Sequence, residues 1–144
     1  MAATKAVKGF GLKAEYLKTA PSTYAEIGEL LSATPPQKSR ETIDATHMQS
    51  PGGYREFISS LRTGGESTLT FNYTPAGYQA LAGMFDDDKP AKFRITLSDG
   101  ATIIFDGLVT EQPIDDIAID DKIGMSCNIQ VTGPVAYTAP TGGV

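Results

Sequence analysis

The chain offers one histidine and one cysteine, the side chains that most often serve as base and nucleophile. His47 stands in a segment rich in Thr, Ser and Gln, and Cys127 lies in the run KIGMSCNIQVTG. Cys127 alternates in phase with Ile123 and Val131, which predicts an inert, core-facing position on a strand. A Cys–His pair would require His47 to fold onto that core position. One histidine also cannot supply the several ligands of a zinc site. We therefore expect no catalytic residues and no cofactor.

Three acidic clusters could suggest a divalent metal: residues 86–88, 115–116 and 120–121. None has the alternating Asp/Asn spacing and following Gly of a calcium loop. We expect a solvated acidic surface and no metal site, the alternative being a role in repelling or pairing with a charged partner. The glycine pairs at 52–53 and 64–65 lack a lysine at phosphate-loop spacing and are expected to be turns.

Length and composition indicate one globular domain. The chain has 144 residues, of which 40% are hydrophobic and 20% charged, and this is enough for one core and too little for two ordinary domains. A single cysteine excludes an internal disulfide framework. The sequence has no apolar run near the ~20 residues that span a bilayer, and its start lacks the apolar centre of a signal peptide. We expect no membrane insertion and synthesis in a cytoplasm.

Charge is distributed unevenly along the chain. The formal net charge of −5 argues against ordinary nucleic-acid binding, which requires a basic face. Residues 1–20 nevertheless carry +3 and residues 101–121 carry −6. This polarity predicts that the basic N-terminal segment pairs with the acidic region of an adjacent copy. The lysines concerned are Lys5, Lys8, Lys13 and Lys18, and the acidic residues are Asp115, Asp116, Asp120 and Asp121.

Period-two alternation predicts a mainly β domain. Residues 122–133 alternate most clearly, residues 67–74 and 91–98 repeat the pattern, and residues 101–112 are apolar on both faces. Weaker strands are expected at 24–31 and 41–46. Ser98-Asp99-Gly100 is expected to be a hairpin turn, because Gly accepts a positive φ.

One helix is expected over residues 75–85. Tyr78, Leu81 and Phe85 form a single apolar stripe, with Thr74 as N-cap. Residues 54–61 have helical spacing but strand-like flanks, and their conformation is left open. Tyr54 and Phe57 could pack under a long loop or contact another subunit.

The most informative stretch is 41–75, which is polar and rich in Gly, Ser, Thr and Pro. It is longer than a compact domain normally needs between two strands. Its segments ETIDAT at 41–46, SPGGYREFI at 50–58 and 65–73 resemble the tail tube proteins of long, non-contractile phage tails, the lambda-like family. Residues 93–95, 99–100 and 131–133 are similar too, so the resemblance spans about residues 22–134.

The resemblance implies a β-sandwich or small barrel of two packed antiparallel sheets with one flanking α-helix and extended terminal arms. It divides the chain into an N-terminal arm (1–20), a tube domain (21–134) and a C-terminal arm (135–144). Some family members carry a further immunoglobulin-like domain, which is not expected here. Six copies would form a ring, and rings would stack into the hollow tail tube of a virion, the conduit for DNA ejection. Expected partners are other copies, the tape-measure protein, and tail-tip and terminator proteins, with assembly in the host cytoplasm and DNA passing without specific binding.

The same resemblance suggests two sets of surface residues. Loop residues would bind the neighbouring ring, and a polar sheet face would line the lumen. Six copies of the −5 chain would give −30 per ring, and such a wall lets DNA slide because it repels phosphate. The ring-stacking candidates are His47, Met48, Gln49, Ser50, Tyr54 and Arg55, and the lumen candidates are Asp106, Lys122, Ser126, Asn128 and Gln130.

Other functions compete with this one. A tube protein of a contractile tail or secretion system would have a closely similar fold. A β-sandwich ligand-binding module would usually show clustered exposed aromatic residues, whereas this chain has no Trp and most of its Tyr and Phe are in phase with the core. An enzyme is the weakest alternative.

Overall fold

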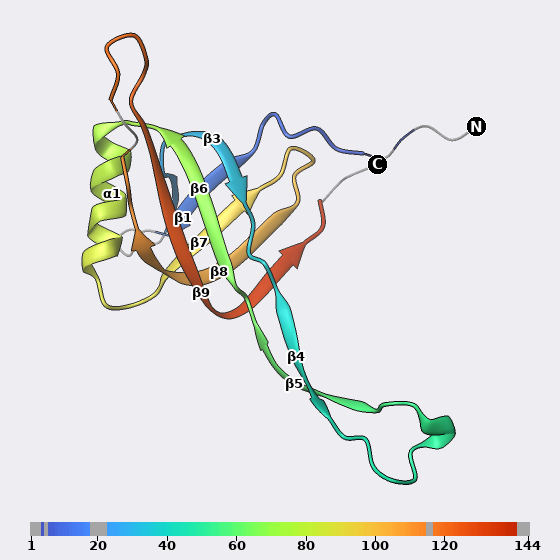
Figure 1. The fold of residues 1–144 in the computed structure, drawn as a ribbon. Helices are drawn as coiled ribbons and strands as arrows, with labels where there is room; N and C mark the ends of the chain where they lie inside the picture. The colour runs from blue at the N-terminus through green and yellow to red at the C-terminus, as the bar shows by residue number, and fades with distance from the viewer. Residues whose placement is uncertain (1–3, 5, 18–22, 115–116, 141–144) are drawn as a thin grey trace.

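The computed structural model describes residues 4, 6–17, 23–114 and 117–140. The chain is mainly β, with two antiparallel sheets and one helix, which confirms the expected fold class (Figure 1). The larger sheet has seven strands in the order β2-β1-β7-β8-β9-β6-β3, and the smaller sheet is the ribbon β4-β5. The elements are β1 (Lys13–Leu17), β2 (Tyr24–Glu26), β3 (Glu29–Thr34), β4 (Ser39–Asp44), a short 3₁₀ helix (Pro51–Gly53), β5 (Phe57–Thr63), β6 (Glu66–Asn72), α1 (Pro75–Asp86), β7 (Ala91–Thr96), β8 (Thr102–Glu111) and β9 (Gly124–Thr138).

The core lies on one face of the seven-stranded sheet. Alternation along β6 and β9 sends every second side chain inward, so that Leu69 pairs with Cys127 and Phe71 with Met125. These four side chains are at most 1% exposed. The adjacent pair β7–β8 adds stacked aromatic rings. The centroids of Phe93 and Phe105 are 5.7 Å apart.

The sheet curls around this core, and α1 covers its open side (Figure 1). β1 and β3 lie close together because of this curvature, although no backbone hydrogen bonds join them as neighbouring strands. The Thr74 hydroxyl accepts a hydrogen bond from the Gly77 amide at 3.2 Å and caps the helix as predicted. A Cβ atom at Gly77 would lie 2.4 Å from the carbonyl oxygen of Ile27. The helix therefore approaches the β2–β3 connection this closely only with glycine at that position.

The termini contribute more to the sheet than the sequence pattern predicted. β1 lies inside the expected N-terminal arm yet pairs with both β2 and β7. Glu15 of β1 accepts hydrogen bonds from Arg94 Nε at 3.2 Å and from its terminal nitrogen at 2.9 Å. At the other end, β9 continues to Thr138 beside β8. The expected arms therefore include parts of the folded domain.

Two local expectations also change. The weak strand at 24–31 is two strands, β2 and β3, separated by Ile27 and Gly28. The ambiguous piece at 54–61 contains no α-helix and mostly belongs to β5. By contrast, the 98–100 turn joins β7 to β8 as expected, with Gly100 at φ 94°.

Candidate assembly surfaces

A long hairpin, residues 39–63, extends away from the body of the domain (Figure 1). It consists of β4, a loop and β5. Ile43 and Ile58 face each other across the two strands but remain 51% and 56% exposed. Leu61 is 80% exposed. A two-stranded hairpin without a covering layer is at best marginally stable in water, and no described part of the chain covers these apolar residues.

The loop at the end of the hairpin is held by a polar network centred on Glu56. Its carboxylate accepts a hydrogen bond from the Ser50 hydroxyl at 2.6 Å and lies 3.3 Å from His47 Nε2. The Glu56 amide donates to the Thr46 hydroxyl at 2.8 Å. The network therefore gives the loop one defined shape.

A second contact fixes the strand ends at the same loop. Arg55 lies 3.2 Å from an Asp44 carboxylate oxygen, and the Thr46 amide donates to the other oxygen at 2.9 Å. Hydrogen bonding from Thr46, with a smaller contribution from Arg55, lowers the pKa of Asp44. Asp44 therefore stays ionised and available as an acceptor under ordinary conditions.

The predicted ring-stacking residues all lie on this loop and divide into two groups. His47, Ser50 and Arg55 make contacts within the loop. Met48 and Tyr54 point outward and are 102% and 78% exposed. Phe57 is 57% exposed as well, so packing of these aromatic residues beneath the loop is excluded. The backbone amide of Gln49 donates to His47 Nδ1 at 3.2 Å. Their contact with a neighbouring ring stays a prediction.

The hairpin is fixed in direction where it joins the body. Gly65 has φ 71°, and its carbonyl oxygen accepts hydrogen bonds from the Val131 amide at 2.9 Å and from Gln130 Nε2 at 3.1 Å. A Cβ atom at Gly64 would lie 2.3 Å from Val131 Cγ1. The chain can pass β9 this closely only because residue 64 has no side chain.

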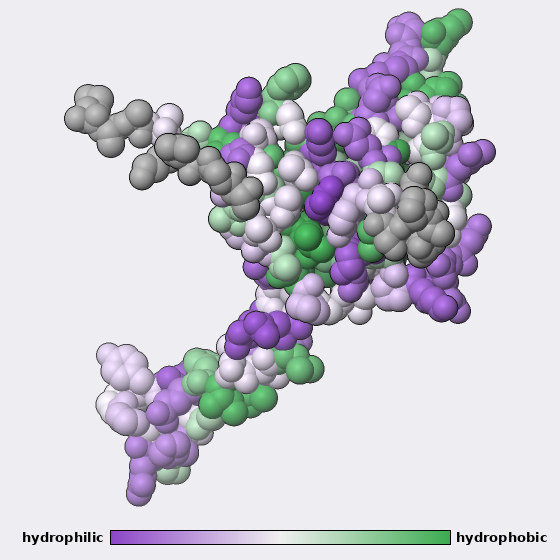
Figure 2. Space-filling view, turned by 180° about the vertical axis from the view of Figure 1, so that it is seen from behind, coloured by the Kyte–Doolittle hydropathy of each residue, from purple (hydrophilic) through white to green (hydrophobic). Residues whose placement is uncertain are grey.

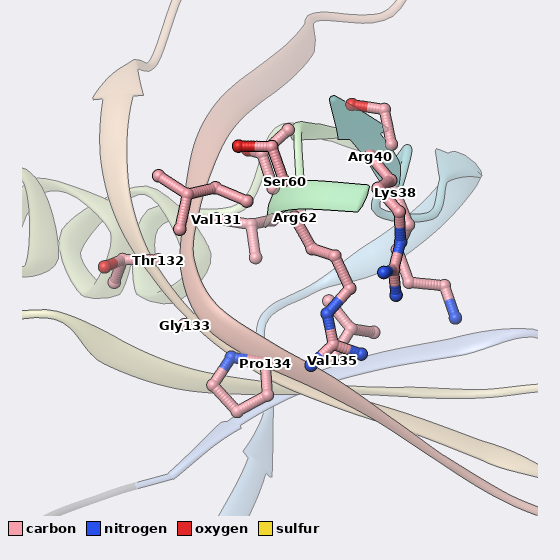
Figure 3. A pocket seen from close by; sticks show the side chains of 13 residues that line it. Lys38, Arg40, Ser60, Arg62, Val131, Thr132, Gly133, Pro134 and Val135 are labelled. Carbon is pink, nitrogen blue, oxygen red and sulfur yellow. The ribbon is translucent and has the colours of Figure 1, made fainter. Parts of the chain in front are cut away.

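A groove of about 1230 Å³ lies beside this junction, between the base of the hairpin and β9 (Figure 3). Lys38, Arg40 and Arg62 line one part of it, and their side chains point in the same general direction (Figure 3). The other wall includes Pro134 and Val135. Sequence reasoning missed this basic groove, because it depends on the register that sets Arg40 opposite Arg62.

The polar face of β9 lies opposite the core, as predicted. Ser126, Asn128 and Gln130 are half-buried among neighbouring strands. Asn128 accepts from the Thr68 hydroxyl at 3.0 Å and donates to Glu111 at 3.1 Å. The other two lumen candidates differ from these. Asp106 on β8 pairs with Lys92 at 3.2 Å, and Lys122 precedes β9 as an exposed loop residue. Whether this face lines a lumen stays a prediction.

The predicted charge pairing is only partly within the described structure, since Lys5, Lys18, Asp115 and Asp116 lie outside the described residues. Asp120 and Asp121 are exposed in the loop between β8 and β9. Lys8 lies over the Phe10 ring, 5.9 Å from its centroid. Lys13 belongs to β1 and is 3.8 Å from Glu26 of its own chain. Pairing between copies through these lysines stays a prediction.

The side chains that could have carried chemistry lie on different parts of the molecule. Cys127 is fully buried in β9, and His47 is on the hairpin loop. Burial raises the pKa of the Cys127 thiol to about 12, so the thiol stays protonated and unreactive. Within the described residues, no three His, Cys, Asp or Glu side chains form a group that could hold a metal ion. No helix in the described part of the chain is long and apolar enough to cross a membrane.

A family model for the lambda phage tail tube protein matches residues 13–138. No curated protein matches the sequence. A chain from the tail of an empty gene transfer agent particle with C6 symmetry is similar in structure, with TM-score 0.75, 18% identity, and coverage of 93% of this chain and 100% of that one.

Two further solved structures have the same fold. One is the SPP1 tail tube, with TM-score 0.72, 12% identity, and coverage of 93% of this chain and 80% of that one. The other is from the sheath–tube complex of an extracellular contractile injection system, with TM-score 0.69, 11% identity, and coverage of 94% and 93%. The family match covers most of the chain and agrees with a curled sheet that carries a projecting hairpin. The chain therefore belongs to the lambda phage tail tube protein family, whose members are structural proteins of the virion tail.

Proposed function

We propose that six copies of the chain form a ring and that rings stack into a hollow tube through which the phage genome leaves the particle. The observation that carries the proposal is the long hairpin, which holds Met48, Tyr54 and Leu61 exposed and away from its own core. Such residues stabilise an assembly by removing apolar surface from water. The C6 symmetry of the similar gene transfer agent tail supports six copies per ring.

The edges of the sheet support ring closure. The hydrogen-bonding order ends at β2 and β3, which leaves strand edges that can pair with another chain. Closing identical copies into a ring covers such edges in every subunit at once. A ring would therefore leave fewer unpaired backbone groups than the single subunit does.

The tube lumen is assigned to the outer face of β6 and β9. Ser126, Asn128 and Gln130 give that face uncharged polar groups. A ring would carry a net charge of −30, so phosphate is repelled near the wall, within a screening distance of roughly 8 Å at physiological salt. DNA would slide past such a surface without being held.

The proposed role requires no catalysis and no cofactor. The partners are other copies of the chain, the tape-measure protein during assembly, and terminator and tip proteins at the tube ends, with assembly in the host cytoplasm. A tube protein of a contractile system is the second candidate, because the sheath–tube complex has the same fold. The family match to a lambda tail tube protein favours the non-contractile tail.

Electron microscopy of concentrated wild-type protein tests the proposal, with hexameric rings and stacked tubes as the expected result. The variant Met48→Ser/Tyr54→Ser removes the two outward residues of the loop. It should form a folded subunit that fails to stack, since neither side chain contributes to the core. The control Phe85→Ser removes an exposed aromatic residue from α1 and should stack normally. Strictly monomeric wild type, or normal tubes from the double variant, would contradict the proposal.

A further inference from the structure

The loop between β8 and β9 combines exposed apolar and acidic side chains in its described part, residues 117–123. Ile117 and Ile119 are 70% and 105% exposed, and Asp120 and Asp121 follow directly. The loop stands out from the body at the end away from the hairpin in both views (Figures 1 and 2). Its base is held by a hydrogen bond from the Ser126 amide to the Pro113 carbonyl at 3.0 Å. An anchored loop with this composition is complementary to a surface that is both apolar and basic.

The groove beside the hairpin base has the complementary composition. None of Lys38, Arg40 and Arg62 makes an ion pair with any described residue. Arg40 and Arg62 face each other directly across β4 and β5. Like charges directly opposite each other destabilise a two-stranded ribbon. Local stability therefore does not explain the pair, whereas a bound carboxylate does.

We propose that residues 117–123 of one copy bind in the basic groove of a second copy. Ile119 packs against the apolar side of the groove at Leu61 and Pro134, and Asp120 and Asp121 pair with Arg40 and Arg62. The inference rests on the proposed self-assembly and names a pair of surfaces through which copies join. The two surfaces differ, so each copy uses one to bind a preceding neighbour and the other to bind the next.

The N-terminal lysines are the competing partner for this loop. Lys13 already has Glu26 as an intramolecular partner at 3.8 Å, and Lys8 lies over the Phe10 ring. Neither of these lysines lines the groove. The arginines of the groove offer bidentate geometry that suits carboxylates better than lysine does. The observations therefore favour the groove.

Charge reversal separates the two partners. Arg40→Glu/Arg62→Glu and Lys8→Glu/Lys13→Glu change the net charge by the same amount. We expect only the arginine variant to lose assembly by sedimentation and electron microscopy. Asp120→Lys/Asp121→Lys should lose assembly too, and the chain with both arginine and aspartate reversals should regain it. All variants should keep the wild-type melting temperature within a few degrees, because every altered side chain except that of Lys13 lies outside the main sheet.

The outcomes distinguish this inference from the proposed function. Wild-type protein that never forms rings or tubes overturns both. Wild-type tubes together with normal assembly of the arginine variant overturn the groove alone. Loss of assembly in the lysine variant, with the arginine variant unaffected, assigns the loop to the N-terminal segment and likewise overturns the groove.

Disulfide cross-linking provides a direct test of proximity. Ile119→Cys and Leu61→Cys proteins, carrying different mass tags, are mixed and oxidised under assembly conditions. A cross-linked dimer of the two tags is expected, and the buried Cys127 should not react. The control replaces Leu61→Cys by Leu31→Cys, which places the thiol at an exposed position of β3. Equal cross-linking to the Leu31→Cys protein would show that Ile119 does not bind specifically in the groove.

Discussion

Cys127 shows how burial decides the behaviour of a reactive side chain. It is surrounded by the core, pairs across the sheet with Leu69, and is 0% exposed. The energetic cost of ionising a thiol in that environment raises its pKa to about 12. Ionisation of this thiol therefore depends on whether the core is folded.

The thiol predicts a specific loss of stability in alkali. The unfolded chain ionises Cys127 near pH 9, whereas the folded chain retains the proton to about pH 12. The contribution is fully present below pH 9 and decreases between pH 9 and 12, by up to about 1.4 kcal/mol per pH unit. Urea unfolding at several pH values measures this slope. Cys127→Ala should show a shallower alkaline decrease in the free energy of unfolding, and identical slopes would contradict the assignment.

At the scale of elements, the junction of hairpin and body depends on a backbone contact. Gly64 passes β9 where a Cβ atom would overlap Val131. The direction of the hairpin is therefore coupled to the packing of β9 against the core.

Gly64→Ala should destabilise the chain by about 1–3 kcal/mol, the usual cost of overpacking, and should impair stacking because the hairpin must shift. Val131→Ala opens space at the same point, so the double variant should be more stable than the sum of the single effects predicts. Denaturant unfolding measures the coupling.

Gly83→Ala on α1 is the control. No heavy atom lies within 4 Å of its Cβ position, and the substitution should stabilise the helix by up to about 1 kcal/mol. Additive effects of Gly64→Ala and Val131→Ala would contradict the contact.

The sequence predicted elements whose pattern is local and long. Residues 67–74 and 122–133 alternate over enough positions to define a buried face, and α1 has both a stripe and a cap. β1 was missed because it is only five residues long, and only Ala14 and Tyr16 face the core. Its partner β7 is also distant in sequence. The end of β9 was missed because Gly133-Pro134 is typical of a strand end. In the structure, a bulge takes up these two residues and pairing with β8 resumes at Val135.

The candidate surfaces also divide into those formed by contiguous residues, which the sequence could predict, and those formed by distant residues, which it could not. The hairpin loop could be recognised from its residues, because its motif is contiguous. The basic groove could not, since it joins residues 38–40, 60–64 and 131–135 through strand register. Exposure of Ile117 and Ile119 was also beyond the sequence, because isoleucine side chains are most often buried.

At the scale of the whole molecule, net charge and face polarity together predict how the tube treats DNA. Assembled wild-type tubes should not retain duplex DNA at low salt, because the chain is acidic and the β9 face is uncharged. Ser126→Lys/Asn128→Lys should still assemble but should bind DNA and slow its ejection. A gel-shift assay of tubes and a time course of DNA release measure these effects. Equal substitutions at exposed positions of α1, Ala76→Lys/Gln79→Lys, serve as the control. Unchanged DNA retention in the β9 variant would remove this face from the lumen.

The rigid junction at Gly64 and Gly65 has a consequence for tubes much longer than one ring. If each ring positions the next through its hairpins, a small error in hairpin angle is repeated at every level and accumulates along the axis. Two residues without side chains would then set the straightness of the tail, since they hold the hairpin angle the same in every copy.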